Sequence, residues 1–445
     1  YGCNKHQKGL YKYLLRDYRG QKIVHVGDNT KADIKCAEEC GIKTKYYKGV
    51  HAIGNPYRSD GMSELIGSAY SGIVNCHLHN GTQQYDTYYE YGFTYGGLYV
   101  FGFCNWIYQK ARAADVEKIL FLSRDGAIYH KVFSRFFSDV PSEYFLWSRT
   151  ANTKYSFEHN GVISFDNAIQ GRVRAQYPCT IGDMLDSLDL GQLKSSLHRY
   201  GFQEKVLITQ ENLKKIQEML FQLKDEILSM YAPQKETIKE YIYHKVGTVN
   251  KIAIVDVGWR GTSLKEIKYI IKNELKLDCE VYCWMAGATS SPDFNLASSI
   301  ADKDIEAYLF SNTCNRELFN IHTRTNHGLN HVFFEMLTQD CSPSYSGVNN
   351  DEKFLFQFPE VENYRSIAKI QQGIFDFCDL FFRTFCYDPY IYNISGYDAY
   401  LPFRIAVRNI NFFRDNLSDF VFSRLVGGNE EETKTIYDLI GIANR

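Results

Sequence analysis

Two aspartates near the start of the chain stand where an acidic metal or phosphate site would lie. The stretch KIVHVGDNTKAD places Asp28 and Asp33 just beyond the apolar run IVHV. Carboxylates at the carboxyl end of a parallel strand face the crevice in which open α/β sheets bind ligands. An oxygen-only pair suits Mg²⁺, which takes one or two carboxylates together with waters and a substrate phosphate. Lys5, near a helix start, can bring an ammonium group to that phosphate. In the alternative interpretation, Asp28 or Asn29 only caps the next helix.

A second group of polar side chains follows the apolar run ILFL. Ser123, Arg124 and Asp125 come directly after it in ILFLSRDGAIYHKVF, and Ser148 and Arg149 follow the next strand-like run in EYFLWSR. Arginine can grip a phosphate with two hydrogen bonds, and an aspartate in the same crevice can act as a base or a metal ligand. The alternative is a strand-to-helix turn that Asp125 caps, and the residues favour neither interpretation.

A third stretch, IAIVDVGWRGTSLKEI, has the shape of an anion cradle. Asp256 ends the apolar run, and Arg260, Gly261, Thr262 and Ser263 lie in the turn and the helix start that follow. Backbone N–H groups in such a turn, with hydroxyls and a guanidinium nearby, can hold an anion. The stretch resembles the phosphoribosyl-binding loop of phosphoribosyltransferases, although the second acid and one glycine of that loop are missing. A plain β-turn-α junction would give the same pattern.

The alternation of apolar runs and helical spacing predicts the elements that must position these side chains. Each of the three stretches passes from a short apolar run through a polar turn into a helical pattern, which is typical of a parallel sheet in an α/β fold. We expect a partial Rossmann-like unit over residues 1–50, a linker over 51–87 and a second α/β domain over 88–180 and 248–350. A helical insertion over 181–247 and a helical C-terminal region over 351–445 complete the expected architecture.

Composition and charge exclude several classes of function. The 445 residues carry a formal net charge of −2, so no overall charge attracts nucleic acid or an anionic membrane. No apolar run is long enough to span a bilayer. The 12 cysteines are scattered singly and form no CxxC pair, so we expect reduced thiols and a cytoplasmic location.

The first stretch and its surroundings resemble the third and fourth motifs of the haloacid dehalogenase (HAD) superfamily. The resemblance rests on Lys5, GDNTKAD and AEECGIKTKYY, in that order. It implies that Lys5 organises the nucleophile and the phosphate, and that Asp28 and Asp33 help to hold Mg²⁺. The nucleophilic aspartate of that family lies on a strand that would precede Tyr1, so we expect an N-terminally truncated HAD unit. FLSRDG also resembles a HAD first motif, with Ser123 in the nucleophile's place and Asp125 in the general acid's place.

FLSRDG, FLWSRT and VDVGWRGTS together resemble a family of large, multidomain HAD-type hydrolases associated with bacterial surface-polysaccharide biosynthesis. This resemblance runs from Lys5 to about Gly347. It implies a phosphorylated sugar or a nucleotide-sugar-type substrate, and glycosyltransferases as partner proteins.

Two functions follow from these observations. The first is a phosphate-handling enzyme, a hydrolase or a transferase, with Asp125 and Asp256 as catalytic residues and the arginines, hydroxyls and glycine turn as phosphate holders. The second is a non-catalytic binding or scaffold module that partners a glycosyltransferase. Ser123 favours the second, because serine is a poor phosphate acceptor without an adjacent base. Glu317 in NRELFNIH is interpreted either as an acid facing Asp256 or as an ordinary surface residue of a helix.

Overall fold

The chain folds into two compact units. The computed structural model describes residues 2–50, 53–54, 57–81, 83–159, 162–166, 169, 179–289, 294–326, 329–348, 353–357, 361–426 and 430–443. Unit 1 comprises Tyr1–Asp60 and Ser68–Gln84, and unit 2 comprises Gly61–Gly67 and Tyr85–Arg445.

Unit 1 contains a two-stranded parallel sheet. Strand β1 (Val24–Gly27) pairs with β2 (Lys43–Tyr46), as a βαβ connection allows. The π-helix η1 (Thr30–Lys35) and helix α2 (Cys36–Glu38) connect the two strands, and helix α1 (Gly9–Asp17) precedes them. A small core holds these elements together and consists of the buried residues Tyr11, Cys36, Ala37 and Ile42.

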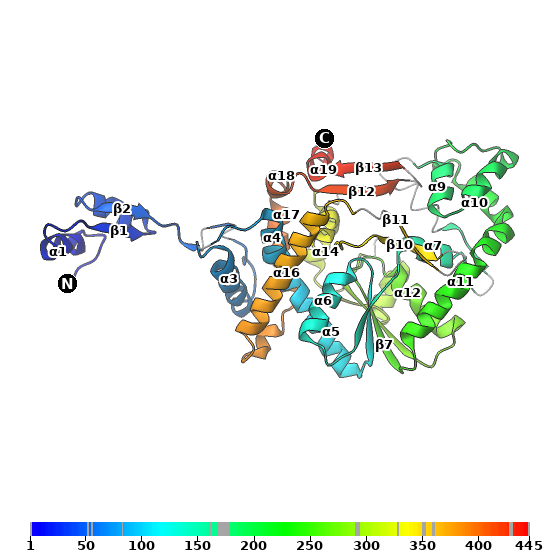
Figure 1. Ribbon diagram of the computed structural model, residues 1–445, viewed down its shortest axis with the longest axis horizontal. Helices are drawn as coiled ribbons and strands as arrows, with labels where there is room; N and C mark the ends of the chain where they lie inside the picture. Colours follow the sequence, from blue (N-terminus) through cyan, green and yellow to red (C-terminus); the bar gives the residue numbers. More distant parts are fainter. Residues whose placement is uncertain are drawn as a thin grey trace. The chain divides into compact units, whose positions relative to one another are not determined.

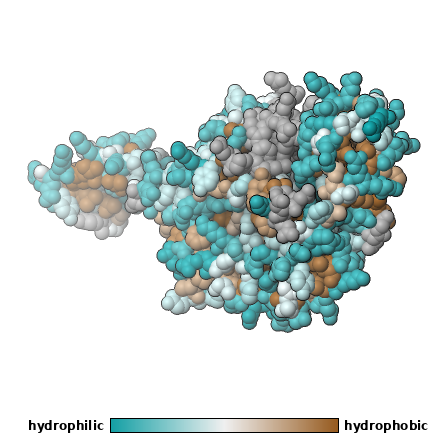
Figure 2. Space-filling model, turned by 45° about the vertical axis from the view of Figure 1, so that its right-hand side comes forward, coloured by the Kyte–Doolittle hydropathy of each residue, from teal (hydrophilic) through white to brown (hydrophobic). Residues whose placement is uncertain are grey.

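One face of the unit 1 sheet lies open to solvent. Val24 and Val26 are 52% and 55% exposed, whereas His25 between them is half-buried. Alternate residues of a strand share a face, so the two valines lie on the same side of the sheet. Figure 2 shows apolar side chains at the surface of this unit. Parallel sheets usually have both faces covered, which makes this open face unusual for its class.

Unit 2 is built on a five-stranded sheet in which every pair of neighbours is parallel. The strand order is β4-β3-β7-β8-β9. Its strands are β3 (Lys118–Leu122), β4 (Ser142–Phe145), β7 (Lys251–Asp256), β8 (Glu280–Gly287) and β9 (Glu306–Phe310). The first strand of the sheet, β3, lies between the second strand, β4, and the third, β7. Successive strands are therefore added on one side of β3 first and on its other side afterwards.

Helices cover both faces of this sheet, so its strands are apolar on both sides, as expected of parallel strands. Helices α5 (Gly97–Ala114) and α6 (Gly126–Phe136) lie on one side of β7, and α11 (Lys224–Val246) and α12 (Thr262–Tyr269) on the other (Figure 1). Phe121 of β3 packs against Phe133 of α6. Leu120 and Leu122, on the opposite face, belong to the core shared with α11 and α12.

A helical insertion lies between β4 and β7 and has a core of its own. Thr180 begins it with a capping box, in which its hydroxyl and the Asp183 carboxylate each accept a backbone N–H of the other residue. The elements between β4 and α11 are α7 (Arg149–Tyr155), β5 (Glu158–His159), β6 (Val162–Ile163), α9 (Ile181–Ser187), η4 (Gly191–Tyr200) and α10 (Leu213–Gln222).

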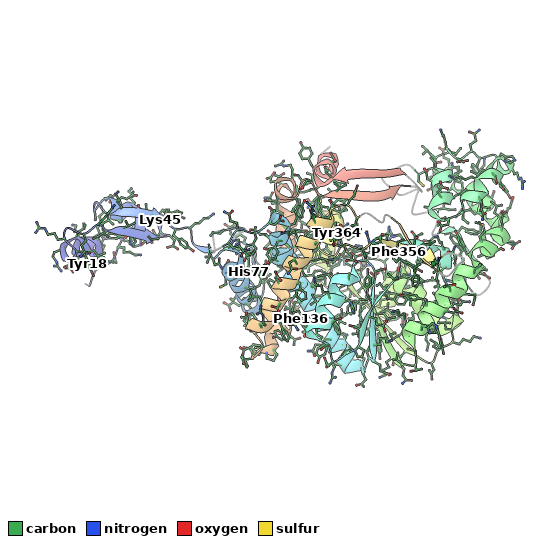
Figure 3. The ribbon with its side chains drawn as sticks, viewed as in Figure 1. Tyr18, Lys45, His77, Phe136, Phe356 and Tyr364 are labelled. Carbon is green, nitrogen blue, oxygen red and sulfur yellow. The ribbon has the colours of Figure 1, made fainter. Side chains whose placement is uncertain are left out.

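The remaining part of unit 2 wraps the sheet domain with helices and two hairpins. Phe136, at the end of α6, packs against Phe375 and Phe382 of α16 (Figure 3). The other elements are α4 (Thr87–Tyr91), η3 (Gly92–Gly96), η5 (Ile270–Glu274), α13 (Phe294–Ala301), α14 (Arg316–Arg324), α15 (Asn330–Glu335), β10 (Ser344–Val348), β11 (Phe354–Gln357), α16 (Tyr364–Thr384), η7 (Pro389–Tyr392), α17 (Gly396–Arg408), α18 (Asn411–Asn416), β12 (Val421–Val426), β13 (Glu430–Thr435) and α19 (Ile436–Ala443).

The predicted fold class is confirmed: an α/β protein with parallel sheets and additional helical parts. Two stretches differ in detail from what the sequence predicted. Residues 51–87, expected as a linker, contain helix α3 (Glu64–Leu78), whose two glycines weaken its helical signal. The C-terminal region, expected to be helical, also contains β11, β12 and β13, because short apolar runs do not distinguish strand from helix. No helix in the described part of the chain is long and apolar enough to cross a bilayer.

Candidate active site

The strand order of unit 2 reverses between β3 and β7, and we call the region beyond the carboxyl ends of these two strands the crevice. In an open sheet of this order, ligands bind beyond the carboxyl ends of the strands, at the gap between the first and third strands. Here those strands are β3 and β7, which are direct neighbours. Asp125 follows β3 by three residues, and Asp256 is the last residue of β7. The topology therefore brings together two of the stretches that the sequence singled out.

Ser123 serves to join the ends of two strands. Its hydroxyl donates to the carbonyl oxygen of Trp147 at 2.6 Å and accepts from the Trp147 N–H at 2.9 Å. Its own N–H donates to the Phe145 carbonyl at 2.8 Å, which continues the β3–β4 pairing. The hydroxyl therefore satisfies backbone groups that the end of β4 would otherwise leave unpaired.

Asp125 faces the crevice and does not cap the helix that follows it. Its side chain accepts no capping bond from α6, and its Oδ1 accepts from the Thr338 hydroxyl at 2.5 Å. Burial raises the pKa of Asp125, while the Thr338 hydroxyl, Arg124 and Arg149 oppose that rise. The capping alternative is thus wrong at this position.

Asp256 lies at the base of the same crevice. Its Oδ1 accepts from the Val257 N–H at 2.8 Å. Burial raises the pKa of Asp256 to about 7, and the negative charges of Asp125 and Glu335 add to the rise. A carboxyl group with that pKa is protonated in part of the molecules at neutral pH, which suits it to proton transfer.

The turn after β7 depends on two glycines with positive φ. Gly258 has φ 138°, and a Cβ there would lie 2.3 Å from the carbonyl oxygen of Gly287 on β8. Gly261 has φ 64° and precedes the first residue of α12. Only glycine combines such backbone angles with so close an approach. Cis peptide bonds join Gly258 to Trp259 here and Ser123 to Arg124 in the turn after β3.

The other predicted phosphate-binding residues surround these turns. Ser148 accepts the Ala151 N–H at 3.1 Å and so caps α7, which places Arg149 at the exposed first position of that helix. Arg124 is half-buried, and neither its guanidinium nor that of Arg149 pairs with a carboxylate of the described residues. Both charges still act on Asp125, so the two arginines lie near the acids with their donors available. On the turn after β7, Arg260 and Thr262 are exposed and Ser263 is half-buried.

Two residues of the crevice were missed by the sequence analysis. Glu335, the last residue of α15, accepts the indole N–H of Trp259 at 2.9 Å, and Thr338 contacts Asp125 as described. Neither stands in a recognisable motif, because both reach the crevice through contacts distant in sequence. Glu317, considered as an acid facing Asp256, instead pairs with Arg404 at 3.2 Å.

In unit 1, the buried Asp33 is the centre of a cluster of polar side chains that are themselves partly exposed. Its Oδ1 contacts the Lys5 ammonium group and lies 3.2 Å from His25 Nε2, and its Oδ2 accepts the Asn29 N–H at 3.0 Å. The Lys5 contact is the main reason that the pKa of Asp33 lies well below its usual range. Lys8, the other lysine at this helix start, pairs with Glu39 instead.

Asp28 presents an exposed carboxylate beside this cluster. It directly follows β1, while the cap of the next helical segment is supplied by Asn29, whose side chain accepts from Lys31 and Ala32. Asp28 therefore fits the requirement of Mg²⁺ for an accessible carboxylate, whereas both oxygens of Asp33 already accept hydrogen bonds. Within the described residues, no group of three or more acidic, histidine or cysteine side chains is arranged to hold a metal ion.

A family model matches a segment of unit 1. Residues 2–52 match a family model described as HAD-hydrolase-like, and this segment contains Lys5, Asp28 and Asp33. No curated protein matches the chain. The match supports a relationship of this segment to the HAD superfamily, as its motifs suggested.

Proposed function

We propose that the protein is a phosphate-handling enzyme, a hydrolase or a transferase, whose working site is the crevice of unit 2. The observation that carries this proposal is that Asp125 and Asp256, the latter with a pKa raised to about 7, lie at the switch point of the sheet near Arg124 and Arg149, whose guanidinium groups pair with no carboxylate among the described residues. Enzymes place groups with shifted pKa values where a proton must move near neutral pH. The HAD-like match in unit 1 points to the same substrate class, a phosphorylated compound.

We infer different tasks for the two acids. Asp256, with its proton held by burial and neighbouring negative charge, donates that proton to the oxygen that leaves the phosphorus. Asp125, whose carboxylate accepts the Thr338 hydroxyl, takes a proton from the attacking water or sugar hydroxyl. Arg124 and Arg149 bind the phosphoryl oxygens and offset their negative charge.

Unit 1 would offer a phosphate site of its own, distinct from the working site that we propose in unit 2, and Mg²⁺ is the cofactor that fits it. In unit 1 the exposed Asp28 would hold it, with waters and the substrate phosphate completing its shell. When bound, the ion would neutralise phosphate charge, while Lys5, fixed by Asp33, would orient the phosphate. The substrate that we propose is a phosphorylated sugar or a nucleotide sugar. We also propose a role in bacterial surface-polysaccharide biosynthesis in the cytoplasm, beside a glycosyltransferase, which rests on the resemblance of the three sequence stretches.

The scaffold alternative draws support from Ser123. Its hydroxyl is bound to the backbone of Trp147 on both its donor and acceptor sides, which leaves it poorly placed to attack a phosphate. A protein in which this crevice binds a phosphorylated glycan precursor without turnover would keep both arginines and have no use for the proton of Asp256.

Turnover and binding assays on matched variants test the proposal. The protein would be mixed with Mg²⁺ and a panel of sugar phosphates and nucleotide sugars, with phosphate release and thermal stabilisation as readouts. We expect Asp256→Asn to lower kcat by about 10²- to 10⁴-fold, because it removes a general acid. Glu317→Gln, which removes an acid outside the crevice, serves as the control.

The variants that lose turnover distinguish an enzyme site in unit 1 from one in unit 2, and both from a non-catalytic scaffold. If Asp28→Asn abolishes turnover while Asp256→Asn leaves it unchanged, the enzyme site is in unit 1. Stabilisation by ligand that requires Arg149, without turnover of any compound in the panel, would support the scaffold.

A further inference from the structure

A short segment, residues 335–340, contacts three neighbouring strands of the unit 2 sheet or the turns that follow them. Its first residue, Glu335, contacts the turn after β7, and Thr338 contacts the turn after β3. Its last residue, Asp340, accepts the hydroxyl of Tyr144 on β4 at 3.4 Å. The three strands lie side by side in the order β7, β3, β4, so the contacts follow the order of the strands. We call residues 335–340 the strap.

Thr338 occupies a fixed place within the strap. It is completely buried, and its N–H donates to the carbonyl oxygen of Glu335 at 3.1 Å. The next residue, Gln339, is held by helix α16, because its carbonyl oxygen accepts the side-chain amide of Gln371 at 2.8 Å. Threonine is also branched at Cβ, which restricts the rotation of its side chain. The Thr338 hydroxyl is therefore presented in one direction.

The single proton of this hydroxyl is directed to Asp125. Two acceptors lie near it, Asp125 Oδ1 at 2.5 Å and the Glu335 carbonyl oxygen at 3.3 Å. A separation of 2.5 Å is typical of a hydroxyl that donates to an ionised carboxylate. A donor of this kind favours the ionised form of the acid, and the Thr338 hydroxyl accordingly lowers the pKa of Asp125 against the effect of burial.

The helix that follows Asp125 does not fix its carboxylate. The backbone of Asp125 has φ −56° and ψ −30°, whereas a residue that caps a helix with its side chain usually has an extended backbone. No capping bond forms between this carboxylate and α6. The strap, from a distant part of the chain, thus supplies the hydrogen bond that the local sequence does not.

We propose that Thr338 is a positioning residue of the site: from the strap, its hydroxyl holds the Asp125 carboxylate in the crevice as an ionised group. The use of that carboxylate in turnover rests on the proposed function, but the effect of Thr338 on Asp125 does not. Thr338 acts only through Asp125 in this scheme.

Two substitutions separate the hydroxyl of Thr338 from the shape of its side chain. Thr338→Val removes the hydroxyl and keeps nearly the same shape. Thr338→Ser keeps the hydroxyl and removes the methyl group. Thr44→Val is the matched control, because Thr44 donates to the carboxylate of Glu38 at the same distance of 2.5 Å in unit 1.

The readout is the titration of Asp125 in the whole chain, followed by NMR of ¹³C-labelled aspartate carboxyls and assigned with Asp125→Asn. We expect Thr338→Val to raise the titration midpoint of Asp125 by about half a pH unit or more, because the ionised form loses its donor. Thr338→Ser should keep the wild-type midpoint, and so should Thr44→Val. In an active enzyme, the acidic limb of the pH profile of kcat/KM should move with the midpoint in Thr338→Val.

An unchanged midpoint in Thr338→Val overturns the proposal. A midpoint raised equally in Thr338→Ser also overturns it, because the hydroxyl would then not be the cause. If Thr338→Val fails to fold, Thr338→Cys replaces it, since a thiol is only a weak donor and should raise the midpoint in the same direction. The expected shifts in a protein that turns over no phosphorylated compound would support the role of Thr338 and contradict the proposed function, so the two can fail separately.

Discussion

Among single residues, Asp256 shows the conflict between stability and function most directly. Its carboxyl group is half-buried next to Asp125 and Glu335, and its pKa is raised to about 7. In the unfolded chain the same group ionises near its ordinary value of 3.8. Folding therefore costs free energy at every pH at which the Asp256 carboxyl group is ionised in the unfolded chain. In the folded chain this group must then either keep its proton or carry an unfavourable charge.

The pH dependence of stability in Asp256→Asn checks this reasoning. The penalty is absent below about pH 4, grows as the pH rises towards 7 and is constant above it. We expect the asparagine variant to be more stable than the wild type by about 1–3 kcal/mol at pH 8 and to match it near pH 4. Denaturant unfolding at both pH values measures the difference.

The exposed Asp302 offers a control, and Asp302→Asn should change stability equally little at both pH values. A variant Asp256→Asn that is less stable than the wild type at pH 8 would contradict the charge repulsion, because the asparagine oxygen can still accept the Val257 N–H.

At the scale of elements, the turn from β7 to α12 is the least replaceable part of the crevice. It must pass so close to β8 that a Cβ on Gly258 would lie 2.3 Å from a backbone oxygen, with φ in a region that side chains rarely adopt. We expect Gly258→Ala to destabilise the unit 2 transition by about 2 kcal/mol or more and to reduce ligand binding.

Gly441→Ala is the comparison for this substitution. Gly441 lies in helix α19 with no atom within 4 Å of its would-be Cβ, so alanine should leave stability unchanged or raise it by about 0.5–1 kcal/mol. Thermal melts of both variants measure the difference. Equal melting temperatures would contradict the claim that the turn after β7 requires glycine at position 258.

The elements around the crevice could be predicted from sequence where the signal is local. The runs before Asp125 and Asp256, and the helices after them, follow from apolar spacing within a dozen residues. Glu335 could not be placed that way, because its position depends on Trp259, 76 residues away in sequence, and on the ring packing around that indole. Glu317 was the more visible acid for the same reason: it lies in the first turn of the 9-residue helix α14, whereas α15 is only 6 residues long.

At the scale of the whole molecule, the chain consists of two units with separate cores. We expect two calorimetric transitions, since units with their own cores can unfold separately. Asp33→Asn should lower the transition of unit 1 by about 1–3 kcal/mol, because it leaves Lys5 and the Asn29 N–H without their charged acceptor. The transition of unit 2 should not move.

The same substitution should remove part of the acid sensitivity of unit 1. The fold lowers the pKa of Asp33. Its contribution to the stability of unit 1 is therefore fully present at pH values above the ordinary pKa of an aspartate, and it is lost as the pH falls below that value. Glu39→Gln, which breaks the exposed pair with Lys8, is the control and should leave both transitions in place. A shift of both transitions by Asp33→Asn would contradict the independence of the units.

The bond between Thr338 and Asp125 joins residues 213 positions apart, and this separation has a kinetic consequence. Contacts so distant along the chain form only after the intervening strands and helices have come together, so the crevice is assembled late in folding. Until then, the acids that repel one another in the native crevice are apart and hydrated, and their repulsion does not slow the earlier steps. On heating we expect the reverse order, in which the contacts of the crevice are lost before the sheet beneath it unfolds.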